Sequence, residues 1–201
     1  MPSTSKVLLA TTNKGKIKEF LAMLSHLDAE ILTPGDLDIQ LDVDETGLTY
    51  AENAKLKAVA FSKQGIITLA DDSGLEVDAL GGAPGIRSAR YAPQPEATDA
   101  DRRKYLIQQL GGIPQPWTAR FRCAIALAEP DGMLHYAEGT CEGQIIPYER
   151  GQGGFGYDPI FKIESRDETM AELPAEVKNQ ISHRARAVQA AYPRLLEILR
   201  K

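Results

Sequence analysis

The chain has 201 residues, a formal net charge of −5 and 43% hydrophobic residues, a composition typical of a globular protein with a substantial core. The negative charge argues against a general binder of nucleic acid or anionic membranes, which usually carries a basic face. No apolar run approaches the roughly 20 residues of a membrane span. Cys123 and Cys141 lack metal-ligand spacing and are too few for a disulfide framework, so we expect a reduced, cytoplasmic setting.

The N-terminal part predicts a strand, a turn and a helix. Residues 6–12 are a short apolar run typical of a buried strand, and apolar residues between 17 and 24 have helical spacing. Backbone N–H groups and the positive dipole end make a helix N-terminus a candidate anion site. A plain turn with solvated lysines is an equally good interpretation. The candidate anion-binding residues are Thr11, Thr12, Asn13, Lys14, Gly15 and Lys16.

Adjacent carboxylates follow the next predicted strand. A capping box at Thr49 predicts a helix to about residue 64, and residues 66–70 read as a buried strand followed directly by Asp71 and Asp72. Carboxylates at that edge of an α/β sheet face a phosphate only with a cation such as Mg²⁺ between them. An Asx turn is the alternative. The residues alone do not decide which aspartate acts, and Glu45 is either a further metal ligand or part of a solvated loop.

The C-terminal half predicts a long hairpin and further helices. Thr98 caps a helix, residues 119–147 alternate as a hairpin with a turn at 130–132, and helices are expected from Pro174 and Ser182, with a kink or break at residues 192–193. We therefore predict an α/β fold in a single domain over residues 1–201, with a mixed central sheet flanked by helices and an extended β-hairpin.

Residues 151–159 concentrate four glycines, two aromatic residues and a carboxylate. Glycine adopts positive φ and lets the backbone approach a ligand closely, while an aromatic ring offers a flat face to a base. We interpret this segment as a binding loop. Downstream, Lys178, His183 and Arg184 carry donors suited to carbonyl or phosphate oxygens. A lone His-Arg pair on a helix, however, is more often a surface feature.

These segments together resemble the inosine/xanthosine triphosphate pyrophosphatases, which hydrolyse non-standard purine nucleotides. Each motif is weak alone, but the ordered set spans residues 7 to 184 and is specific. The matches are Thr11-x-Asn13-x-x-Lys16, Glu45-Thr46-Gly47-x-Thr49-x-x-Glu52-Asn53-Ala54, Ala70-Asp71-Asp72-Ser73-Gly74-Leu75, Gly81-Gly82-x-Pro84-Gly85 with Ser88-Ala89-Arg90-Tyr91, Gly154-Phe155-Gly156-Tyr157-Asp158-Pro159, and Ser182-His183-Arg184.

The resemblance implies a role for each candidate residue. Asp72 would accept the proton of the attacking water and, with Glu45, hold Mg²⁺, while residues 11–16 cradle the triphosphate. Phe155 would stack on the purine. The other implied substrate-binding residues are Ser73, Gly156, Tyr157, Asp158, Lys178, His183 and Arg184. The resemblance further implies a homodimer with the active site in a cleft between two lobes.

The implied activity is Mg²⁺-dependent attack of water at the α-phosphorus of ITP, dITP or XTP, releasing pyrophosphate. A hydrolase of oxidised or pyrimidine nucleoside triphosphates is the alternative enzyme. A purine-nucleotide sensor without turnover is the alternative binding protein, and the intact Asp71–Asp72 pair argues against it. We expect no nucleic-acid or membrane partner.

Overall fold

The computed structural model describes residues 5–40 and 42–201, which divide into two compact units. Unit 1 comprises the described residues up to Asp72, together with Cys123–Gly139 and Arg184–Lys201. Unit 2 comprises Ser73–Arg122 and Thr140–His183. The chain therefore passes between the units several times, once directly after the two aspartates.

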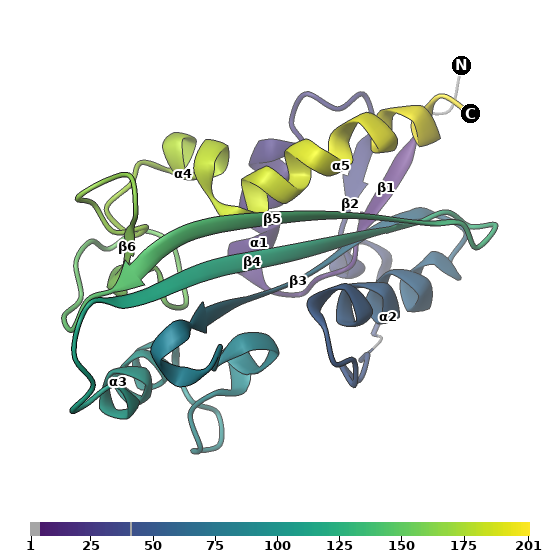
Figure 1. Cartoon of the computed structure of the whole chain (residues 1–201). Coiled ribbons are helices and arrows are strands. Elements are labelled where there is room, and N and C mark those ends of the chain that lie inside the picture. Colours follow the sequence, from purple (N-terminus) through teal and green to yellow (C-terminus); the bar gives the residue numbers. More distant parts are fainter. Residues whose placement is uncertain (1–4, 41) are drawn as a thin grey trace. The chain divides into compact units, whose positions relative to one another are not determined.

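The predicted α/β fold with a mixed sheet is confirmed (Figure 1). The strand order is β2-β1-β3-β4-β5-β6; β1 runs parallel to β2 and β3, and β5 runs antiparallel to β6. The strands are β1 (Lys6–Leu9), β2 (Glu30–Leu32), β3 (Ile67–Val77), β4 (Trp117–Ala128), β5 (Leu134–Ile145) and β6 (Phe161–Ile163), and the α-helices are α1 (Lys14–Met23), α2 (Tyr50–Ser62), α3 (Asp99–Gln109), α4 (Ala175–Ile181) and α5 (His183–Leu199).

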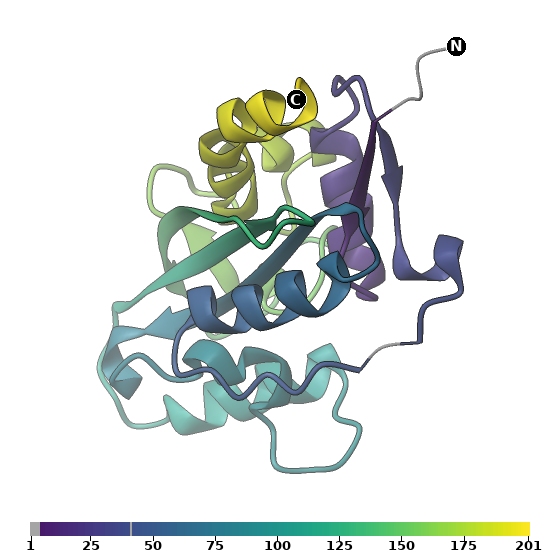
Figure 2. The same cartoon turned by 90° about the vertical axis from the view of Figure 1, so that its right-hand side faces the viewer.

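Unit 1 buries both faces of its part of the sheet. Alternate residues of a strand point to opposite faces, and β1 divides accordingly: Val7 and Leu9 pack with α1 and α5, whereas Leu8 packs with α2. Figure 2 shows α2 on one face of these strands and α1 and α5 on the other. This arrangement gives consecutive strand residues entirely different surroundings, which matters for the two aspartates of β3.

Unit 2 has a core of its own. Leu75 and Val77 of β3, Leu106 of α3 and Phe121 of β4 pack together with Phe161 of β6. Thr98 caps α3 and forms a full capping box with Asp101: the Asp101 amide donates to the Thr98 hydroxyl and the Asp101 carboxylate accepts from the Thr98 amide.

Strand β3 corrects the prediction that the strand ends before Asp71. It continues to Val77, so both aspartates lie within an extended segment rather than in a turn. The run Asp-Asp-Ser-Gly has turn-like composition, but β4 lies beside β3 in the sheet. A hydrogen-bonding neighbour therefore keeps β3 extended beyond the point where β1 ends.

The helices bring two smaller corrections. Helix α5 runs through Pro193, so the predicted break is wrong, while a kink there stays a prediction. The helix continues because its apolar face, including Val188 and Leu195, packs into the unit 1 core. At α2, Thr49 accepts from the Glu52 amide as predicted, but the Glu52 carboxylate accepts from the Leu48 amide. Only half of the predicted capping box forms.

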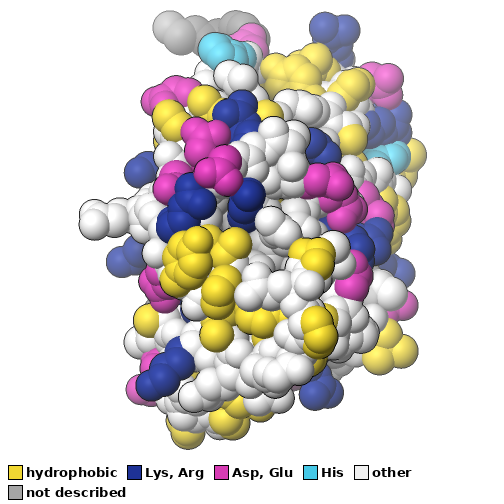
Figure 3. Space-filling model, turned by 60° about the vertical axis from the view of Figure 1, so that its left-hand side comes forward, with side chains coloured by type: hydrophobic (Ala, Val, Ile, Leu, Met, Phe, Trp, Pro, Cys, Tyr) yellow, Lys and Arg dark blue, Asp and Glu magenta, His cyan; other side chains and the backbone are white. Residues whose placement is uncertain are grey.

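No helix within the described ranges is long and apolar enough to cross a bilayer. On the molecular face drawn in Figure 3, acidic and basic side chains are interspersed, and hydrophobic side chains gather beside them.

Candidate functional site

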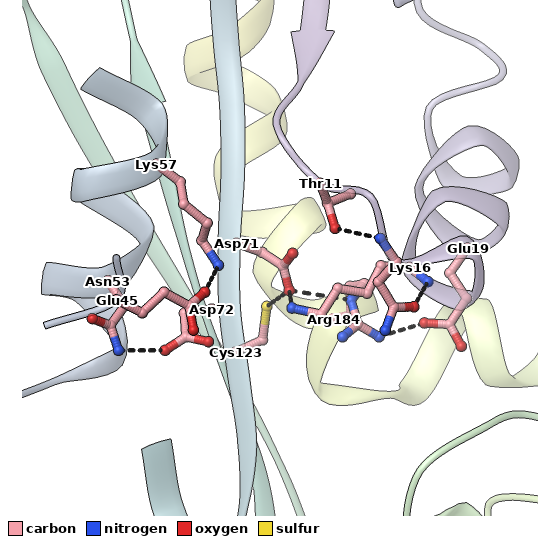
Figure 4. Close-up of polar contacts among 11 residues, drawn as sticks. Thr11, Lys16, Glu19, Glu45, Asn53, Lys57, Asp71, Asp72, Cys123 and Arg184 are labelled. Atoms are coloured by element: carbon pink, nitrogen blue, oxygen red, sulfur yellow. Dashed lines mark hydrogen bonds and ion pairs between the residues drawn. The ribbon is translucent and has the colours of Figure 1, made fainter. Parts of the chain in front are cut away.

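Asp71 and Asp72 point to opposite sides of β3 (Figure 4). Asp71 is fully buried, and its Oδ2 lies 2.8 Å from Lys16 Nζ and 3.5 Å from Arg184 Nε. Asp72 is 6% exposed and faces α2, where its Oδ2 accepts a hydrogen bond from Asn53 Nδ2 at 3.1 Å. We call these five residues the carboxylate cluster.

The charge of Asp71 is held by cations. Burial favours a higher pKa for Asp71, but Lys16 and Arg184 outweigh burial and hold the pKa below its usual value. Arg184 is itself buried and forms a second ion pair with Glu19 of α1 at 2.5 Å. Asp71 therefore remains a carboxylate that fixes two cations, and the Cys123 thiol, also buried, lies 3.9 Å from its Oδ2.

Asp72 has a different electrostatic environment. Burial raises the pKa of Asp72 above its usual value and the Glu45 carboxylate adds to the rise, while Lys57 opposes it. Lys57 Nζ lies 2.6 Å from Glu45 Oε1. The surroundings thus favour the charged form of Asp71 and disfavour that of Asp72, which suits Asp72 better than Asp71 as a proton acceptor or metal ligand.

Helix α2 holds the loop of residues 42–47, which carries Glu45 and is called the acidic loop, in place. Asn53 donates to Asp72 through Nδ2 and accepts from the Gly47 amide through Oδ1 at 2.8 Å. A Cβ at Gly47 would lie 2.7 Å from that Oδ1, so only glycine fits there without displacing Asn53. Asn53 and Lys57, four residues apart on one helix face, thereby connect Glu45 and its loop to Asp72.

The carboxylates of Asp72 and Glu45 are suited to a magnesium ion that also binds a phosphate ligand. Among the described residues, no three or more His, Cys, Asp or Glu side chains gather as a ligand set. Mg²⁺ usually takes only one or two protein carboxylates and completes its shell with phosphate oxygens and water. Asp72 and Glu45 interact electrostatically, and both offer hard oxygen donors.

The turn at 11–16 has the expected form of a helix N-terminus. Asn13 caps α1, its Oδ1 accepting from the Lys16 amide at 3.0 Å, and Thr11 Oγ1 accepts from the Asn13 amide. Thr12, Asn13 and Lys14 are exposed. The turn therefore presents the positive end of a ten-residue helix beside Lys16, the arrangement that suits an anion.

The binding loop, residues 151–159, depends on glycine for two separate reasons. Gly151, Gly154 and Gly156 all have φ between 60° and 81°, the left-handed region that glycine adopts without strain. A Cβ at Gly151 would overlap the backbone of Ala171, and one at Gly154 would overlap the Asp158 carboxylate. At Gly151 and Gly154 a side chain is thus excluded both by conformation and by space, and at Gly156 by conformation alone.

Asp158 and Lys178 organise the backbone beneath Phe155. Asp158 Oδ2 accepts from the Phe155 amide at 2.8 Å and lies 2.5 Å from Lys178 Nζ. The ammonium group of Lys178 also lies 5.1 Å from the centroid of the Phe155 ring. Lys178 is only 5% exposed, so its charge is directed at these two residues.

Tyr157 and His183, which are predicted to contact the substrate, are buried in unit 2. Tyr157 is 4% exposed, and its hydroxyl donates to the Ser88 carbonyl at 2.9 Å, which anchors the loop to residues 85–90. His183 stacks on Phe121 with centroids 4.7 Å apart. Burial raises the pKa of Tyr157, so it remains a neutral phenol. Their contacts with a substrate stay predictions.

The structure divides the predicted site residues between the units. Unit 1 brings together Lys16, Asp71, Asp72 and Arg184; unit 2 brings together Phe155, Gly156, Asp158 and Lys178, and also contains Ser73 within β3. Arg184 pairs with carboxylates, and its predicted contact with a base stays a prediction. The sequence did not single out Glu19, Asn53 or Lys57 as site residues. Only Asn53 could have been found from the sequence, because it lies in the motif of residues 45–54.

The chain is similar to known proteins over almost its whole length. Residues 7–194 match the model of the Ham1 family. A protein of Desulforamulus reducens named dITP/XTP pyrophosphatase is 48% identical over 198 residues, covering 98% of this chain and 96% of that protein. One of the same name from Geobacillus kaustophilus is 49% identical, covering 91% and 90% of the two chains.

Solved structures agree. A HAM1 protein from Coxiella burnetii is 39% identical with a TM-score of 0.86, covering 96% of this chain and 99% of that one. The Ham1 protein of Staphylococcus aureus is also 39% identical, with a TM-score of 0.84 and coverage of 96% and 100%.

Proposed function

The chain belongs to the Ham1 family, and from that membership and the geometry of both units we propose that it hydrolyses ITP, dITP and XTP to the monophosphate and pyrophosphate. The observation that carries the proposal is the asymmetric aspartate pair: Asp71 is bound to two cations while Asp72 faces Asn53 and Glu45. The names of the relatives supply the nucleotide class.

In the proposed reaction, water attacks the α-phosphorus and the bond to the bridging oxygen of the β-phosphate breaks. Asp72 takes the proton from the water, and the electron pair of the broken bond leaves with pyrophosphate. Lys16 and the N-terminus of α1 bind phosphate oxygens, since oriented cations and amides stabilise the charge that develops there. Asp71 keeps Lys16 in position through the 2.8 Å ion pair.

Glu45 and Asp72 are the residues that would hold Mg²⁺. When bound, the ion neutralises phosphate charge and lowers the pKa of water. Lys57, paired with Glu45 at 2.6 Å, keeps the glutamate near Asp72. Removing divalent cations with EDTA should abolish hydrolysis, and Mg²⁺ should restore it; full activity in EDTA would exclude the metal.

A stacking residue and three hydrogen-bond donors would select the base. Phe155 offers its ring to the purine, and the donors of Lys178, His183 and Arg184 suit the 6-oxo group of hypoxanthine or xanthine. Adenine presents a 6-amino donor, so a donor would face a donor. A site that requires such buried hydrogen bonds discriminates by roughly 10⁴-fold or more.

The direct test is hydrolysis of dITP, XTP and dATP by the purified protein, with products identified by chromatography. We expect pyrophosphate and monophosphate from dITP and XTP and little product from dATP. Equal rates on dITP and dATP, or release of orthophosphate alone, would contradict the proposal. Faster hydrolysis of oxidised or pyrimidine nucleotides would assign the chain to the alternative substrate class.

We also propose a homodimer in a reduced, cytoplasmic setting. Two buried, unbridged cysteines agree with the redox state. Light scattering coupled to size-exclusion chromatography should give twice the 22.0 kDa chain mass. A mass of one chain at micromolar concentration would contradict the dimer.

A further inference from the structure

Two side chains of α3 form hydrogen bonds with the peptide groups on both sides of Gly156. The Gly156 amide donates to Asp99 Oδ2 at 2.8 Å, and the Gly156 carbonyl accepts from Arg103 Nη1 at 2.8 Å. Asp99 and Arg103 are four residues apart and so lie on one face of the helix. Neither residue belongs to the motifs that identify the binding loop.

Both side chains are held by further ion pairs. Arg103 donates to the Glu149 carboxylate through Nε at 2.8 Å and through Nη2 at 3.0 Å, and its side chain is only 12% exposed. Asp99 pairs with Arg102 on the same helix. The fork of Arg103 therefore meets the loop with a fixed orientation, because a bidentate pair restricts the guanidinium plane.

Charged side chains consequently fix the backbone of Phe155 on both sides. The amide preceding its Cα donates to Asp158 Oδ2, and the next amide, that of Gly156, donates to Asp99. Arg103 then holds the following carbonyl. The direction in which the Phe155 ring leaves the loop follows from these bonds.

Glycine alone does not explain this conformation. Gly156 has φ of 60°, and a Cβ there would meet no atom within 4 Å. Among the described residues, no steric contact with the space of a Cβ enforces the left-handed backbone, and glycine visits many other conformations. The bonds from α3 supply the missing restraint.

We propose that Asp99 and Arg103 are positioning residues for purine recognition: they hold the Gly156 peptides and so orient Phe155 toward the base. The inference deepens the proposed function, since it rests on Phe155 stacking on the purine. An alternative is that Asp99 merely stabilises the first turn of α3. Asp101, in the same turn, tests that alternative, because it forms the capping box with Thr98 but no contact with the loop.

The test compares Asp99→Ala and Arg103→Ala with the matched controls Asp101→Ala and Lys104→Ala. We expect the KM for dITP to rise about tenfold in the first two variants, as for loss of one charge-assisted hydrogen bond. The kcat should change by less than about threefold, because the reacting groups are untouched. Asp99→Asn and Arg103→Lys should recover part of the loss, and the controls should keep the KM of the parent protein.

Hydrogen exchange without nucleotide separates this inference from the proposed function. The Gly156 amide should exchange faster in Asp99→Ala and at the parent rate in Asp101→Ala. Unchanged exchange, or a KM that rises equally in the controls, would overturn the inference. If the parent protein hydrolyses no purine triphosphate but Asp99→Ala exchanges faster, the proposed function fails while the hold on the loop stands.

Discussion

The carboxylate cluster and the binding loop are built in opposite ways. In the cluster, side-chain charges set the geometry: Asp71 lies between Lys16 and Arg184, and the backbone around it is an ordinary strand. In the loop, the backbone sets the geometry. Several glycines adopt left-handed φ values, and the Asp158 carboxylate accepts a hydrogen bond from the backbone amide of Phe155.

This difference determines which substitutions are informative in each region. Removing a charge at constant shape, as in aspartate to asparagine, should act strongly in the cluster, because a buried cation then loses its partner. Adding a methyl group at constant charge should act strongly at Gly154 of the loop, where both space and backbone angle exclude it. The predictions below exploit this contrast.

The largest effect is expected from Asp72→Asn. The substitution removes the proposed proton acceptor and metal ligand, and kcat should fall by about 10³–10⁴-fold. Because burial raises the pKa of Asp72, its charge is not a source of stability, and the urea midpoint should not decrease. Steady-state hydrolysis of dITP and urea unfolding measure the two effects. Hydrolysis at the parent rate would exclude Asp72 as the base.

Asp71→Asn, unlike Asp72→Asn, should lower the stability of the fold. The cations Lys16 and Arg184 hold the pKa of Asp71 low against the effect of burial, so its charge stabilises the folded state at neutral pH. Losing it leaves buried Arg184 poorly compensated, and the free energy of unfolding should fall by about 3–4 kcal/mol. Asp72→Asn is the matched control. Equal unfolding free energies for the two variants would contradict the asymmetry of the pair.

Gly154→Ala tests the loop by adding a methyl group. Its Cβ would overlap the Asp158 carboxylate, which also binds Lys178 and the Phe155 amide. We expect a loss of about 2–3 kcal/mol in dITP binding, read from KM. Gly156→Ala is the control: it has the same sign of φ but open space, so backbone strain alone should cost about 1 kcal/mol. Equal effects would show that the overlap does not matter.

Local sequence patterns predicted much of the fold but not the contacts between elements. The alternation of residues 119–147 and the signal of Thr98 lead to the correct hairpin and helix. The end of β3 could not be predicted, because it depends on β4, which follows about forty residues later in the chain. Pro193 likewise reads as a break until the packing of α5 is known.

The site shows the same division. The place of Lys16 at a predicted helix N-terminus makes it a candidate, whereas only the family resemblance favours Asp72 over Asp71, and both roles stay predictions. The contacts of these residues could not be predicted, because Glu19 and Lys57 resemble the solvated charges of any amphipathic helix. Asp99 and Arg103 were missed for this reason too. Only the fold reveals which helical face meets a carboxylate or a backbone amide.

Phe155→Ala has the smallest expected effect apart from the control variants, and it separates the two regions most clearly. Loss of stacking should weaken purine binding by about 1–2 kcal/mol, raising the KM for dITP about 5- to 30-fold. Phe155→Tyr, which keeps a ring, should bind nearly as the parent does, and Tyr148→Ala, which removes an exposed aromatic outside the loop, should have no effect. Inhibition by inorganic tripolyphosphate, which lacks a base, should be unchanged in Phe155→Ala, because this inhibitor would engage only the proposed phosphate-binding residues of unit 1. An equal loss of affinity for dITP and for tripolyphosphate would mean that the loop does not act on the base.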